Sequence, residues 1–163
     1  MGRMSHAQAP QSFGRVDDDG TVYVRTSDGE RSVGQVPDST SEEALEFFVR
    51  RYRALETEVS LLESRVSSGT ASPEEARSAA SKLVTSIREA NAVGDLESLA
   101  ARVEALTPTI DAKAETRREE RAEAKARAKQ AKEEMVAQAE AIAAGSDWRG
   151  GIGKFRDLLD QWR

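Results

Sequence analysis

The sequence contains no cysteine, and its single histidine is His6, in a polar N-terminal segment. The absence of cysteine excludes disulfide bonds, thiolate metal ligands and cysteine nucleophiles. Histidine and cysteine carry much of acid–base, nucleophilic and zinc chemistry, so their scarcity argues against an enzyme. We therefore expect a non-enzymatic protein with no catalytic residue, no metal, no cofactor and no small-molecule substrate.

Long apolar runs are also missing. No segment reaches the roughly 18 apolar residues of a membrane-spanning helix, and residues 1–11 lack the apolar run of a signal peptide. These absences predict a cytoplasmic protein without a membrane partner.

Aromatic residues make up only 5% of the chain, whereas charged residues make up 33%. A composition this polar disfavours a compact core of ordinary size, so we expect an elongated, mostly α-helical molecule.

Residues 1–12 read as a disordered tail, and two Asp-Gly pairs divide the segment that follows. Asp19-Gly20 and Asp28-Gly29 separate short runs that are rich in β-branched residues. This pattern predicts a three-stranded β-meander over residues 13–36, because glycine accepts the positive φ of tight hairpin turns. A sheet of this size is only marginally stable by itself, and we therefore expect one of its faces to pack on a helix. The alternative is a β-hairpin arm that touches a partner.

Apolar residues then recur every three or four positions. Ser39 to Glu43 offer overlapping capping boxes, which predict a helix that begins there and continues to about Val66. Its heptad seam consists of Leu45, Phe48, Tyr52, Leu55, Val59, Leu62 and Val66. Shorter stripes continue the pattern, so residues 41–110 are predicted to form an antiparallel coiled-coil-like helical bundle. The seam packs either on the other helices of the chain, which the short connections favour, or on a second copy.

Residues 108–145 change in kind, because Ala, Glu, Lys, Arg and Gln dominate them and no aromatic residue interrupts them. Such a composition predicts a long charged helix. Five basic residues at spacings of 3, 4, 4 and 3 fall on one face of it: Arg118, Arg121, Lys125, Lys129 and Lys132. A row of cations can follow a nucleic-acid backbone without reading bases. The alternative is a solvated helix held by ion pairs such as Glu123–Arg127 and Lys129–Glu133.

The segment 146–163 carries the most hydrophobic stripe of the chain. Trp148, Phe155, Leu159 and Trp162 recur on one side of a predicted helix, and no later element follows to cover them. We expect that this segment is the start of a helical repeat and that the chain is truncated. Otherwise, the stripe docks back on the chain or onto a partner.

Two sets of residues resemble a known family. The first runs from Gly14-Arg15-Val16 to Val33-Gly34 and into the heptad helix. It resembles the N-terminal region of actinobacterial members of the bacterial domain-of-unknown-function 349 family. The closing Trp148, Phe155, Leu158, Leu159 and Trp162 are similar to the opening helix of the repeat that defines this family. The resemblance implies that the aromatic stripe is a core face whose partner helices are missing. It implies no activity, because the family has none established.

These patterns point to macromolecular binding. We expect a non-enzymatic binding or adaptor protein that uses its long helix to contact RNA or a ribonucleoprotein such as the ribosome. The alternative is a structural coiled-coil protein that self-associates or binds a protein partner.

Overall fold

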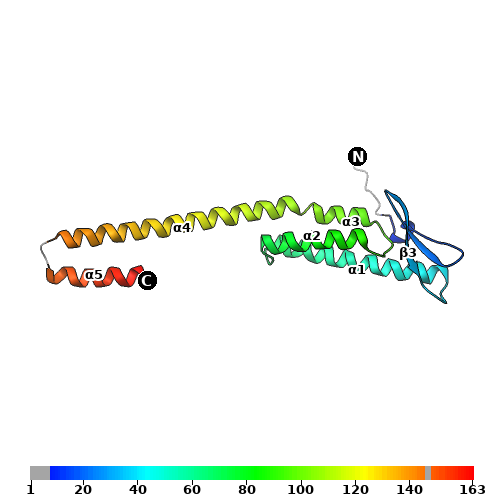
Figure 1. Ribbon diagram of the computed structural model, residues 1–163, viewed down its shortest axis with the longest axis horizontal. Helices are drawn as coiled ribbons and strands as arrows, with labels where there is room; N and C mark the ends of the chain where they lie inside the picture. The colour runs from blue at the N-terminus through cyan, green and yellow to red at the C-terminus, as the bar shows by residue number, and fades with distance from the viewer. Residues whose placement is uncertain (1–7, 146–147) are drawn as a thin grey trace. The chain divides into compact units, whose positions relative to one another are not determined.

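The computed structural model describes residues 8–145 and 148–163 (Figure 1). The chain forms two compact units, the first ending at Ala114 and the second beginning at Glu115. The first holds a small antiparallel sheet and the helices α1, α2 and α3, and the second holds most of α4 together with α5. The prediction of a mostly helical fold with a small N-terminal sheet is confirmed.

The sheet follows a short 3-10 helix, η1 (Pro10–Phe13). Its strands are β1 (Gly14–Val16), β2 (Thr21–Thr26) and β3 (Gly29–Gln35), in the order β1-β2-β3. Both predicted turn glycines have positive φ, 82° at Gly20 and 111° at Gly29. One face of the sheet packs on a helix, as expected, because Val22, Val24 and Val33 are buried in one cluster with residues of α1.

The predicted disordered tail is wrong for residues 10–12. Proline favours the first position of a helical turn because its φ is already fixed. Pro10 takes this place in η1, and the Ser12 hydroxyl donates a hydrogen bond of 2.7 Å to the Ala9 carbonyl. Phe13 then packs against the core. Residues 1–7 lie outside the described part of the chain, so the rest of that prediction is untested.

Helix α1 (Ser41–Ser68) begins at a complete capping box. The Thr40 hydroxyl accepts a hydrogen bond from the Glu43 amide, and the Glu43 carboxylate accepts one from the Thr40 amide. Two orphan amides are thereby satisfied. The helix ends at Gly69, which has a left-handed φ of 73°. All seven residues of the heptad seam lie in the core, five of them buried and Leu45 and Leu55 half-buried.

Helices α2 (Pro73–Glu89) and α3 (Leu96–Glu104) supply much of the other side of this core. Each begins at a polar cap, Ser72 for α2 and Asp95 for α3. The connection between them is buried as well, since Ala92 and Val93 are fully enclosed. The Val93 amide donates a hydrogen bond of 3.1 Å to the Phe48 carbonyl of α1. The seam of α1 is therefore covered within a single chain.

Helix α4 (Thr107–Ala144) begins after a break that follows α3, and Pro108 stands in its first turn. Helix α5 (Trp148–Trp162) contacts the C-terminal part of α4. Gly151 of α5 lies so near Ile142 of α4 that a Cβ there would come within 3.1 Å of Cγ2 of Ile142. Within the described residues, no helix is long and apolar enough to cross a membrane.

Candidate nucleic-acid interface

The middle of α4 is exposed on every side. Each residue from 118 to 134 is exposed, and Ile110 is the only buried residue in the helix. Burial of an apolar face therefore contributes nothing to this stretch. Its stability comes from intrinsic helix propensity and from pairs of charges on its surface.

Most of these charges are sorted by sign around the helix, although Arg127 lies among the acidic residues. At about 100° per residue, the five predicted contact residues, Arg118, Arg121, Lys125, Lys129 and Lys132, fall within an arc of roughly 80°. The acidic residues Glu115, Glu119, Glu120, Glu123, Glu133 and Glu134 occupy the remaining side. We call the five basic residues the basic face. The α-helical backbone of α4 runs through all of them, so the structure places these residues along one side.

Ion pairs within the helix leave this face accessible. Arg118 pairs with Glu115 at 3.2 Å and Lys129 with Glu133 at 3.9 Å, yet each of these two cations keeps 78% of its side chain exposed. Exposed pairs of this kind contribute only about 0.3–0.5 kcal/mol, so an anion can displace them. The predicted pair Glu123–Arg127 also forms, at 3.4 Å. It lies outside the basic face.

An aromatic side chain lies at one end of the basic face. The Lys132 ammonium stands 4.8 Å from the centroid of the Trp162 ring, which α5 brings back to α4. Trp162 lines a shallow groove with the basic-face residues Lys125, Lys129 and Lys132, together with Ala128, Glu133 and Val136. Sequence reasoning missed this contact, because the charged segment itself contains no aromatic residue. Predicting it would have required knowing how α4 and α5 pair, because that pairing places Trp162 beside Lys132.

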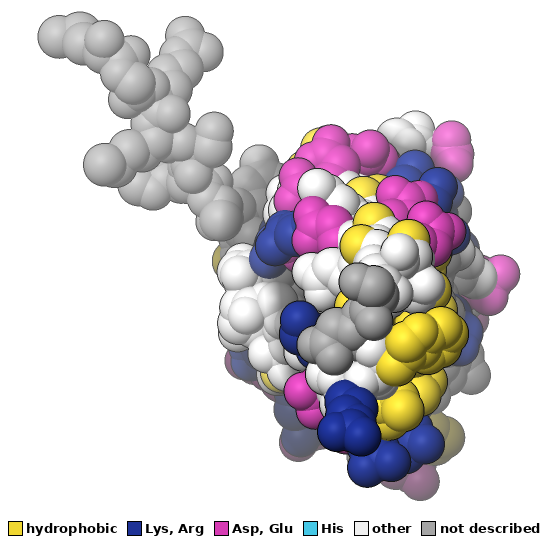
Figure 2. Space-filling model, turned by 90° about the vertical axis from the view of Figure 1, so that its left-hand side faces the viewer, with side chains coloured by type: hydrophobic (Ala, Val, Ile, Leu, Met, Phe, Trp, Pro, Cys, Tyr) yellow, Lys and Arg dark blue, Asp and Glu magenta, His cyan; other side chains and the backbone are white. Residues whose placement is uncertain are grey.

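The predicted partner-docking face is exposed. Trp148 is 77% exposed, Leu159 56%, Trp162 44% and Phe155 42%, and Ile152 joins them at 60%. All except Trp162 line a second groove, which Ile142 of α4 closes on one side. Figure 2 shows a view in which hydrophobic side chains gather in one patch beside Lys and Arg side chains.

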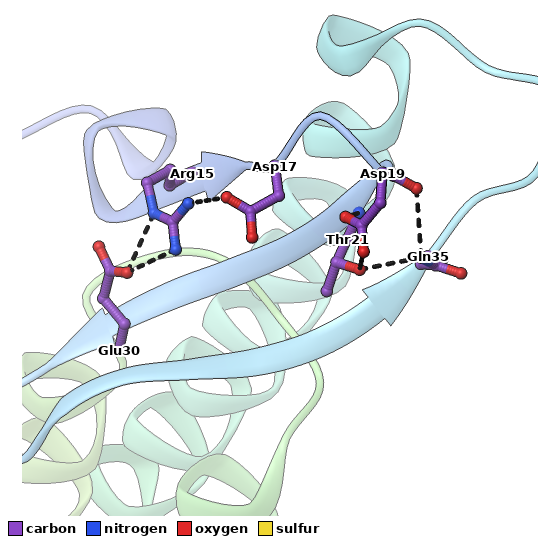
Figure 3. Close-up of polar contacts among 6 residues, drawn as sticks. All are labelled: Arg15, Asp17, Asp19, Thr21, Glu30 and Gln35. Atoms are coloured by element: carbon purple, nitrogen blue, oxygen red, sulfur yellow. Dashed lines mark hydrogen bonds and ion pairs between the residues drawn. The ribbon is translucent and has the colours of Figure 1, made fainter.

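The acidic turn at Asp17 to Asp19 serves the sheet. Arg15 pairs with Asp17 and, at 2.9 Å, with Glu30 (Figure 3). Its guanidinium also stacks on Tyr23. These carboxylates raise the pKa of Arg15, Glu30 most. Hydrogen bonds that Thr21 donates lower the pKa of Asp19. In the described part of the chain, no three potential metal ligands cluster together.

A second polar contact holds α3 on α1 in the first unit. Arg102 donates two hydrogen bonds to the Glu63 carboxylate, at 2.7 and 3.1 Å. This pairing raises the pKa of Arg102. Since both side chains are engaged with each other, the pair serves the bundle and offers no free charge to a ligand.

Comparison with known proteins gives one family. Residues 98–163 match the family described as Domain of Unknown Function (DUF349). The match confirms the resemblance to this family for the C-terminal residues, whereas the resemblance of residues 14–34 to actinobacterial members lies outside it. The match begins at Ser98, well before Trp148, where the resemblance placed the start of the defining repeat, and it includes the whole of α4 and α5. No curated protein and no solved structure shows significant similarity to the chain.

Proposed function

We propose that the protein is a cytoplasmic, non-enzymatic adaptor that binds RNA, alone or within a ribonucleoprotein such as the ribosome, through the basic face of α4. The observation that carries the proposal is the separation of charge by sign on a helix with no other visible task. From Arg118 to Lys132 the face extends over roughly 21 Å at 1.5 Å per residue.

The overall charge makes this arrangement informative. The chain carries a formal charge of −5, which repels a polyanion over most of the surface. Cations placed on one side of a helix, with the acids on the other, give a local attraction that the net charge conceals. A helix stabilised only by ion pairs needs no such separation, because pairs four residues apart form equally well all around it.

Salt dependence tests the proposal. If all five cations neutralise phosphates of single-stranded RNA, log K should fall with log[salt] at a slope near −3.5, since each contact contributes about −0.7. Affinity would then drop roughly 100-fold between 50 and 200 mM salt. Fluorescence anisotropy with a labelled 20-mer of uridine measures this slope. A flat response would refute RNA binding.

The chain offers a matched pair of variants. Lys125 and Arg127 are two residues apart on α4, but only Lys125 lies on the basic face. Lys125→Gln should flatten the slope by about 0.7, whereas Arg127→Gln should leave it unchanged. Equal effects of the two substitutions would show that the contact does not follow this face.

The exposed apolar groove of α5 favours a second candidate, a structural protein that self-associates or binds a protein partner. Four large exposed apolar side chains gather around one groove, and such a patch is often a protein interaction site. In this candidate, α1 packs in coiled-coil fashion on helices of its own chain, and the groove of α5 makes the contact with the partner. Sedimentation equilibrium of the wild type and of Ile152→Glu separates the two. A wild-type dimer that the substitution dissociates supports self-association, and a monomer in both cases excludes it.

A further inference from the structure

The contact between Trp162 and the basic face follows from how α4 and α5 pair. Gly151 of α5 lies beside Ile142 of α4, and the two helices run antiparallel (Figure 1). Trp162 lies 11 residues beyond Gly151 on α5, and Lys132 lies 10 residues before Ile142 on α4. Both steps correspond to roughly 15 Å of helix, so the indole arrives beside the ammonium.

Core packing does not account for this position. Trp162 is 44% exposed, whereas Phe48, an aromatic residue of the core, is 3% exposed. On the C-terminal part of α4, Met135, Ala139 and Ile142 share one side of the helix and each is half-buried. Trp162 lies past this apolar strip, in the groove that basic-face residues line.

The groove combines three kinds of surface. Trp162 offers an aromatic ring, Ala128 and Val136 offer apolar surface, and Lys125, Lys129 and Lys132 offer three cations against the single carboxylate of Glu133. This combination suits a ligand with a flat aromatic part and anionic groups on either side of it. Among the residues that the structure describes, the neighbouring groove of Trp148, Ile152 and Leu159 has Arg156 as its one charged lining residue, so it lacks this set of cations.

We infer that Trp162 and this groove form a stacking site for one unpaired base of single-stranded RNA, with the adjoining phosphates on Lys125, Lys129 and Lys132. The inference rests on the proposed RNA binding and deepens it by naming the form of RNA. Unpaired bases stack on aromatic side chains, while duplex RNA keeps its bases inside and offers the backbone. The protein therefore prefers single strands to duplexes of the same length.

The full chain tests this with two probes, a 12-mer of uridine and a 12-base-pair RNA duplex. Trp162→Ala should weaken binding of the single strand roughly 5- to 140-fold, the usual effect of losing one stacking aromatic. Its affinity for the duplex and its salt slope should stay as in the wild type. Trp148→Ala is the matched control, because Trp148 lies on the same helix outside this groove and should change neither affinity.

A spectroscopic readout leaves Trp162 in place. The chain has two tryptophans, so Trp148→Phe makes Trp162 the only one. The single strand should quench its fluorescence, and the duplex should quench it much less. Trp162→Phe should restore a large part of the single-strand affinity that Trp162→Ala loses.

The outcomes separate the two proposals. Salt-dependent binding of both RNAs with no effect of Trp162→Ala, or with equal losses for both RNAs, would overturn the stacking site and leave the basic face intact. Absence of quenching on single-strand binding would overturn it as well. If the wild type binds neither RNA, the proposed function fails and the stacking site fails with it.

Discussion

Replacing Gly94 by alanine tests the packing that joins the α2–α3 connection to α1. A Cβ on Gly94 would lie 2.3 Å from Cδ2 and Cγ of Tyr52, more than 1 Å inside ordinary contact. The Tyr52 ring is only 7% exposed, so it cannot swing into solvent without opening the core. Overpacking of this kind costs about 1–3 kcal/mol. For a unit of roughly 100 residues, each kcal/mol lowers Tm by about 4–8 °C.

Urea and thermal unfolding, followed by circular dichroism at 222 nm, measure the effect. In a Tyr52→Ala background the extra methyl has room, so Gly94→Ala should cost at least 1 kcal/mol less there than in the wild type, roughly as for other residues in contact. Gly153→Ala is a control for the substitution itself, because a Cβ there meets nothing within 4 Å and alanine favours the helix. A Gly94→Ala protein as stable as the wild type would refute the close contact.

Two further predictions concern stability. Thr40→Ala removes the capping box of α1 and should cost about 0.5–2 kcal/mol in urea unfolding; Thr57→Ala, in the middle of the same helix, is the control and should be neutral. Burial raises the pKa of Tyr52, with Glu56 and Asp95 adding to the effect. Folding therefore favours the neutral form of Tyr52. The contribution of this side chain to the free energy of unfolding is complete below a pH of about 10 and is lost as pH rises through the folded-state pKa. Tyr52→Phe should flatten the decline of Tm between about pH 9 and 11, and an unchanged decline would count against this account.

The buried side of α1 shows how far periodicity reaches. The heptad spacing identified all seven seam residues, because a helix must bury such a stripe to gain from it. It missed Ala44 and Val49, which are buried at 2% and 0% exposure beside the seam. A seam of period 3.5 describes contact with one neighbour. Here α1 also packs against the valines of the sheet and against the enclosed Val93. Its buried face is therefore wider than the heptad seam alone.

Helix caps could also be predicted from the sequence, since a capping side chain acts on amides only a few residues away. The Thr40 box forms as the sequence predicts, and α2 begins at a box of the same kind, with Ser72 followed three residues later by Glu75. The Ala92–Val93 connection carries no comparable local signal. Two apolar residues show neither the period of a strand nor that of a helix, so their burial depends on where α1 passes beneath them.

The candidate site likewise has one part that depends on local sequence and one part that depends on contacts between distant residues. The basic face depends only on helical geometry, and any chain that is helical from Arg118 to Lys132 presents it. The position of Trp162 depends on the register of two helices. The sequence gives little sign of that register, since Met135, Val136 and Ile142 are the only large apolar residues between positions 112 and 144. Gly151 marks one point of that register, because a Cβ there would come within 3.1 Å of Cγ2 of Ile142. A site made from one helix could thus be anticipated, whereas its aromatic neighbour needed the fold.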